Sequence, residues 1–260
     1  MYKTNAMKKY TLLIFVLSLG FLFSCKPKDE DKPSHEDEAP TTELKARVNI
    51  IPTYQGTPMD FNQNYTTQEG YTISFTKLNI IMSEFKNNEN QLFKSAIYKF
   101  DKDKKLLWEG VGDYSQFSSF TAKIGLNSTL NHSDPSAKET DDPLFILNSG
   151  DMHWGWSTGY IFVMLEGKAD TTAAQSGSLA SFSYHIGNDD MTRDFSLTDI
   201  QWNKLNSHLY ETNIYLDLSK VFDNGANSID IKTERTSHTG PTEIPLSEKF
   251  IDNFMHALSK

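Results

Sequence analysis

Alternating hydrophobic and polar positions recur along much of the chain and predict β-strands. Between residues 73 and 85 apolar side chains recur at Ile73 and Phe75 and then at Leu78, Ile80 and Met82. Successive side chains of a strand point to opposite faces, so the change of phase near Thr76 and Lys77 predicts a bulge in one long strand. Shorter strands are predicted at residues 47–51, 120–126 and 212–218.

Two more segments, residues 160–165 and 180–186, also have the pattern of strands. The first is a continuous apolar run, which is typical of a central position in a sheet. In the second, apolar residues occupy the even positions, and Ser181, Ser183 and His185 occupy the odd ones. We therefore expect His185 to lie on the face opposite the apolar row.

The end of the chain has a helical pattern instead. Its apolar positions are Phe250, Ile251, Phe254, Met255 and Leu258. This spacing predicts one terminal helix, with Ser247 as its N-cap. Residues 131–142 are a predicted polar loop. Because strands dominate the rest, we predict an all-β fold, an antiparallel β-sandwich of immunoglobulin-like or jelly-roll-like type with a short C-terminal helix.

The start of the chain has the features of a lipoprotein signal peptide. Two lysines precede an apolar run over residues 12–23, which ends in the lipobox Leu22-Phe23-Ser24-Cys25. We expect residues 1–24 to be removed and Cys25 to carry the lipid, including fatty acyl chains such as palmitate. Several acyl chains give durable membrane anchoring, so an outer-membrane location is predicted, at the cell surface or on the periplasmic face.

The next segment, residues 25–42, is charged and nearly free of apolar side chains, so we expect a disordered tether. Its acidic cluster, residues 29–31, resembles an export tag for surface lipoproteins and equally fits a generic solvated linker. Residues 43–260 then form one predicted β-sandwich domain, a length that buries a substantial core.

Charge and cysteine content narrow the chemistry of this domain. The formal net charge of −9, without a basic stripe, argues against a nucleic-acid partner. Cys25 is the only cysteine, so its lipidation leaves no thiolate for a disulfide, a metal or a nucleophile. Nucleophile-elbow, phosphate-loop and zinc-protease motifs are missing from the sequence, and we expect no enzymatic turnover.

Three ordered blocks of residues carry the most specific signal. The first contains Met152, Trp154, Trp156, Gly159, Tyr160, Phe162, Glu166 and Gly167. The second contains Phe182, Tyr184, His185, Ile186 and Gly187, and the third Ile251, Asp252, Asn253 and Phe254. With these blocks the chain resembles the MbnP-like copper-binding protein family, from roughly Arg47 onward.

The resemblance implies an exported β-sandwich that binds copper, Cu(I) or Cu(II), through histidines. In some members a tryptophan oxidised to kynurenine assists, and a dihaem peroxidase-like partner is held responsible for the oxidation. The candidate ligands here are His185, His153 and His238, and the residues lining the site or forming kynurenine are Trp154, Trp156 and Met152. Imidazole is a suitable copper ligand, and a thioether suits soft Cu(I). A TonB-dependent receptor would be a further partner in metal uptake.

Several alternatives stay open at this stage. Family members often draw another ligand from the first strand, whereas residues 51–56 contain no histidine here, so the site is either incomplete or uses a histidine such as His132. The chain could have kept the fold and lost the metal. A different class of function is a surface glycan- or protein-binding module, in which Trp154, Trp156 and Tyr160 form a stacking platform.

Overall fold

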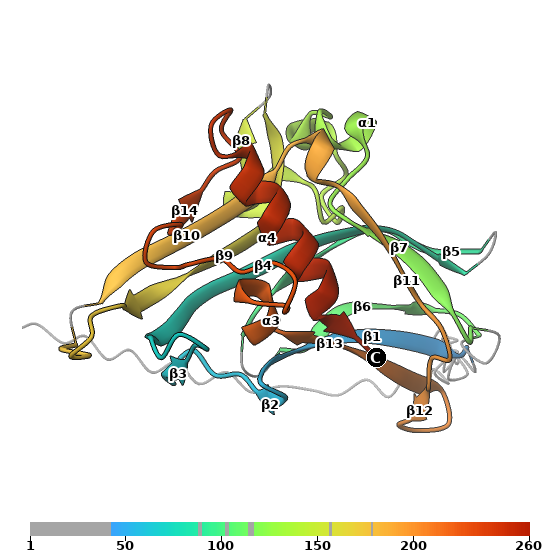
Figure 1. Cartoon of the computed structure of the whole chain (residues 1–260). Helices are drawn as coiled ribbons and strands as arrows, with labels where there is room; N and C mark the ends of the chain where they lie inside the picture. The colour runs from blue at the N-terminus through green and yellow to red at the C-terminus, as the bar shows by residue number, and fades with distance from the viewer. Residues whose placement is uncertain (1–42, 88–89, 102–103, 114–116, 156–157, 178) are drawn as a thin grey trace, which may run out of the picture. The chain divides into compact units, whose positions relative to one another are not determined.

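The domain is built from two β-sheets that share one hydrophobic core, with helix α4 (Ile244–Ala257) packed beside them (Figure 1). The computed structural model describes residues 43–87, 90–101, 104–113, 117–155, 158–177 and 179–260. Within these ranges the chain forms a six-stranded and a nine-stranded sheet. The predicted all-β fold with a short C-terminal helix is therefore confirmed.

The six-stranded sheet of the described residues is centred on β1 and β13. Its strands are β1 (Lys45–Tyr54), β2 (Thr57–Pro58), β6 (Leu106–Val111), β12 (Asn203–Lys204), β13 (Leu209–Asp217) and β15 (Leu258–Ser259). β1 pairs with β13 in parallel and with β6 in antiparallel orientation. The sheet thus joins the first strand of the domain to one of its last.

The nine-stranded sheet has the order β11-β7-β4-β9-β10-β14, with β3, β5 and β8 pairing off this path. Its strands are β3 (Tyr65–Thr66), β4 (Thr72–Asn87), β5 (Asn90–Lys99), β7 (Phe120–Ile124), β8 (His153–Gly155), β9 (Gly159–Asp170), β10 (Ala180–Gly187), β11 (Arg193–Leu197) and β14 (Thr236–Ser237). β9 lies between β4 and β10, as its apolar run predicted. The expected bulge is also present, as a register shift between Phe75 and Lys77.

Short helices occupy the connections. They are α1 (Ser128–Asn131), η2 (Pro135–Ala137), α2 (Ile146–Ser149), η3 (Gly150–Met152), η4 (Asp189–Met191) and α3 (Ser219–Phe222). Residues 131–142, predicted as a polar loop, therefore include one short helical turn, whose Asp134 side chain caps the Ser136 N–H. No helix among the described residues has the length and apolar character needed to span a membrane.

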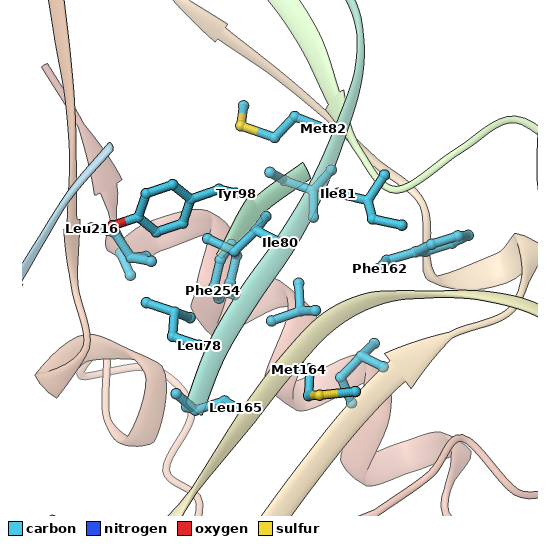
Figure 2. Close-up of a cluster of buried hydrophobic side chains, with 14 of the residues drawn as sticks. Leu78, Ile80, Ile81, Met82, Tyr98, Phe162, Met164, Leu165, Leu216 and Phe254 are labelled. Atoms are coloured by element: carbon cyan, nitrogen blue, oxygen red, sulfur yellow. The ribbon is translucent and has the colours of Figure 1, made fainter. Parts of the chain in front are cut away.

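Aromatic and aliphatic side chains from both sheets and α4 fill the core. Figure 2 shows Leu78 and Ile80 of β4 pointing toward Leu216 of β13 and Phe254 of α4. All four side chains are fully buried. Removing such a side chain from water stabilises the fold by about 1.5–3 kcal/mol before entropy costs, so this cluster holds the two sheets and the helix together.

Two details of the sequence prediction were wrong. β1 pairs with β13, and β10 with β14, in parallel, so the sandwich is only mostly antiparallel. Ser247 is not the N-cap of the terminal helix, which begins earlier, at Ile244, with Pro245 in its first turn. Proline is favoured there because its missing N–H would have no partner within the helix. Ser247 is instead fully buried inside α4.

Candidate metal site

His185 lies on the outward face of β10, as the alternation predicted. Tyr184 and Ile186 on either side of it are fully buried in the core, whereas the His185 side chain is 16% exposed. Its Nε2 lies 2.7 Å from Oε1 of Glu166 and 3.2 Å from the Ser183 hydroxyl. Glu166 comes from β9, where it is the register partner of Ser183. The histidine is thus held by one carboxylate and one hydroxyl on the same face of the sheet.

The parallel pairing of β14 with β10 brings His238 to the same place. Ser183 pairs with Thr236 and Tyr184 with Ser237. The next residues along the two strands are His185 and His238, and parallel strands in register present such neighbours on one face. The two imidazole centroids lie 4.8 Å apart, with the ring planes inclined at 83°. Two of the three predicted histidine ligands therefore form a pair, which we call the His185–His238 pair.

Hydroxyl groups fasten the segment that carries His238. The Thr239 hydroxyl donates to the carbonyl of His185 at 3.2 Å and accepts from the N–H of Gly187 at 3.2 Å. The buried Ser237 and Ser247 hydroxyls lie 2.6 Å apart. Ser247, mistaken for a cap in the sequence, therefore ties α4 to the strand that precedes His238.

Glu243 fixes the backbone of the same segment from the other side. Its Oε2 accepts the N–H of His238 at 2.8 Å and that of Gly240 at 3.0 Å. The hydrogen bond from His238 is the main reason that the pKa of Glu243 lies below its ordinary value. The exposed His238 ring thus stands on a backbone that is held at several points.

Trp154 packs near Gly187, at the end of β10. A Cβ atom placed on Gly187, two residues after His185, would lie 2.6 Å from Cζ3 of the Trp154 ring. Because Gly187 has no side chain, the half-buried Trp154 ring can pack against its backbone. Trp156, the second tryptophan of the motif, lies outside the described residues, as does Cys25.

His153 has a different environment from the pair. Its ring packs edge-on against Tyr160 at 4.6 Å between centroids, and burial lowers its pKa, which favours the neutral ring. Met152 beside it is fully buried in the core. His132, the alternative ligand, lies 3.2 Å from a carboxylate oxygen of Asp189. Across the described part of the chain, no three His, Cys, Asp or Glu side chains are grouped to hold a metal ion.

The structure also weakens the sugar-platform alternative. Tyr160 is fully buried, and its hydroxyl donates to the carbonyl of Leu144 at 2.7 Å. Burial raises its pKa to about 12. A stacking platform needs exposed rings, so the prediction that Tyr160 contributes to one was wrong.

Glu166 was not predicted from the sequence to contact His185. It ends the apolar run of β9, and alternation alone places it on the polar face. What the sequence pattern lacks is the register between β9 and β10, which sets Glu166 diagonally across from His185. The first strand, which contains no histidine at residues 51–56, lies in the other sheet.

Two comparisons with known proteins give a match. The sequence model of the MbnP family matches residues 43–242. Among solved structures the chain is similar to MbnP from Methylosinus trichosporium, with 15% sequence identity and a TM-score of 0.47, covering 76% of this chain and 81% of that one. A search of curated proteins gave no match. Because the family match spans well over half of the sequence, the chain belongs to the MbnP family.

Proposed function

We propose that this chain is a copper-binding protein and that the His185–His238 pair holds the ion. The observation that carries the proposal is the 4.8 Å approach of two imidazole rings from strands that are far apart in the sequence. Family membership supports copper as the metal, given the resemblance of the three sequence blocks. Acquisition, storage or delivery of copper, without turnover, is the role we infer.

The donor set suits copper. Imidazole nitrogen is a common copper ligand. Trp154, whose ring lies near Gly187, is a candidate for a further ligand position if it is oxidised to kynurenine, because the new amine offers a lone pair that the indole N–H lacks. His153, packed on Tyr160, and the buried Met152 are then supporting residues rather than ligands of this pair.

Competition with a chromophoric Cu(I) chelator under reducing conditions tests the proposal. We expect one high-affinity ion per chain, and a loss of at least about 100-fold in affinity for His185→Ala and for His238→Ala, since removing a ligand should cost at least as much as removing an outer-shell partner. His256→Ala, on the exposed face of α4, is the matched control and should bind like the wild type. Affinity unchanged by either substitution in the pair would rule the site out.

We further propose that Cys25 anchors the protein in the outer membrane, with the domain outside the cytoplasm. The support is the lipobox and the charged segment behind it. Metabolic labelling with a palmitate analogue should mark the wild type and leave Cys25→Ala unlabelled and released from membranes. Equal labelling of both chains would contradict the anchor.

The partners that we propose follow from the same role. A dihaem peroxidase-like enzyme would oxidise the tryptophan, and a TonB-dependent receptor would take part in uptake. Co-expression with such an enzyme should increase the mass of the peptide that contains Trp154 and Trp156 by the conversion to kynurenine. An unchanged mass of this peptide after co-expression with an active enzyme would contradict the partnership.

A further inference from the structure

The contact between Glu166 and His185 bears on which nitrogen of the histidine is free. Nε2 of His185 lies 2.7 Å from Oε1 of Glu166, within the range of a charge-assisted hydrogen bond. An ionised carboxylate only accepts hydrogen bonds. The hydrogen of a neutral His185 ring must therefore sit on Nε2, and the lone pair must sit on Nδ1.

The second neighbour of Nε2 does not change this assignment. The Ser183 hydroxyl lies 3.2 Å from Nε2 and can either donate or accept. Because it adapts to either tautomer, it selects neither. The carboxylate is the group that decides.

Glu166 has a polar residue opposite it on each of the two adjacent strands. Its register partners are Ser183 on β10 and Lys77 on β4. Lys77 also forms an ion pair with Asp151. The pKa of Lys77 is raised, chiefly by the hydrogen bond to Asp151, and the negative charge of Glu166 adds to the effect. Glu166 therefore lies close enough to Lys77 for the two charges to interact.

We infer that Glu166 is a positioning residue that holds His185 as the Nε2–H tautomer, so that Nδ1 is the atom presented to a metal ion. The part of this inference that concerns the metal rests on the proposed function. The part that concerns the tautomer holds for the metal-free protein. Carboxylate partners of metal-binding histidines fix the tautomer and the ring orientation in this way.

Long-range ¹H–¹⁵N NMR of the histidine rings in the purified, metal-free protein tests the tautomer directly. At a pH where the ring is neutral, the wild type should show the His185 hydrogen on Nε2. Glu166→Gln keeps an acceptor oxygen and should keep this pattern, whereas Glu166→Ala should give a mixture of tautomers. A wild-type ring with its hydrogen on Nδ1, or an unchanged pattern in Glu166→Ala, would overturn the inference.

Glu109→Gln is the matched control for loss of a carboxylate. Glu109 forms an ion pair with Arg47 and is 27% exposed, close to the 31% of Glu166, but it lies in the other sheet. It should leave the His185 signals unchanged. The control separates a general effect on folding from the local effect on the ring.

Copper affinity provides the second readout. Removing an outer-shell partner typically lowers metal affinity by about 10–100-fold, so Glu166→Ala should lose that much and Glu166→Gln less. If the protein binds no copper at all, the proposed function fails while the tautomer result stands. If copper binds at the pair and Glu166→Ala binds as tightly as the wild type, the positioning role fails while the proposed function stands.

Discussion

The two faces of β10 have opposite character within a single strand. Phe182, Tyr184 and Ile186 point inward and are at most 1% exposed. His185 and Ser183 point outward and are half-buried; His185 contacts the Glu166 carboxylate, and the Ser183 hydroxyl contacts the His185 ring. One strand thus supplies side chains to the hydrophobic core and to the polar surface, because neighbouring side chains point in opposite directions.

Helix α4 connects the two faces. The Phe250 ring stacks on Tyr184 at 4.9 Å between centroids, on the inward side. Three residues earlier in the same helix, the Ser247 hydroxyl contacts that of Ser237, which precedes His238. The helix that closes the core therefore also sets one half of the His185–His238 pair.

The largest loss of stability should come from removing a core side chain on the inward face of β10. Phe182→Ala should lower the free energy of unfolding by about 3–5 kcal/mol, because a buried aromatic ring is replaced by a cavity. The ring packs edge-on against Phe75 at 6.0 Å and Phe222 at 5.7 Å. Urea denaturation measures the loss. Ser181→Ala, exposed on the outward face of the same strand, should stay within about 0.5 kcal/mol, and an equal loss in both variants would refute the comparison.

A smaller effect should come from crowding the outward face. In Gly187→Ala the new Cβ would lie 2.6 Å from the Trp154 ring and 2.6 Å from the Tyr160 carbonyl oxygen, so we expect a loss of about 1–3 kcal/mol. Thermal unfolding followed by circular dichroism gives the measurement. Gly112→Ala is the control, because nothing lies within 4 Å of its Cβ position. If Gly187→Ala proves as harmless as the control, Trp154 does not pack there.

Two buried tyrosines differ in whether their hydroxyl has a hydrogen-bond partner. The Tyr184 hydroxyl donates to the carbonyl of Glu234 at 2.6 Å, whereas the Tyr98 hydroxyl has no hydrogen-bond partner among the described residues. Tyr184→Phe should cost about 1–2 kcal/mol of unfolding free energy, and Tyr98→Phe should be neutral or stabilising. Paired urea titrations test the difference. A larger cost for Tyr98→Phe would show that its hydroxyl has a partner.

The smallest effect concerns pH and the loop network around Asp189. Burial raises the pKa of Asp189, but hydrogen bonds from Ser128 and Asn131 outweigh it and leave the pKa below its ordinary value. A depressed carboxylate pKa stabilises the fold above the unfolded value of about 3.9, and this stability is lost as pH falls through the lower folded pKa.

Replacing the carboxylate isolates its contribution to acid stability. Asp189→Asn should be destabilised near neutral pH and should lose stability less steeply between about pH 5 and pH 2. Unfolding free energies measured across this range test the slope. Asp190→Asn, at the exposed neighbouring position, is the control and should follow the wild type. If the unfolding free energy of Asp189→Asn changes with pH as steeply as that of the wild type, the network around Asp189 does not contribute to acid denaturation.

Much of the fold could be predicted from the pattern of side chains. Alternation located the bulge in β4 and the outward direction of His185, and a continuous apolar run located the central position of β9, because these features depend on neighbours in the sequence. Small strands such as β2, β3 and β12 escaped prediction, since two residues carry no periodic signal. Ser247 was misread because a serine before an apolar helical run also fits a buried hydroxyl inside the helix.

The sequence by itself determined which side chains are available as nitrogen or sulfur ligands, since Cys25 is the only cysteine and the histidines are few. Only the tertiary structure decided which of them meet. His238 joins His185 through a parallel pairing of two distant strands, and Glu166 reaches the same ring through the register of β9 on β10, while His153 packs on Tyr160. The physical reason is that local alternation determines the face of the sheet on which a side chain lies. Which side chain it meets on the next strand depends on the register and orientation of the two strands, and these are set by the packing of the whole core.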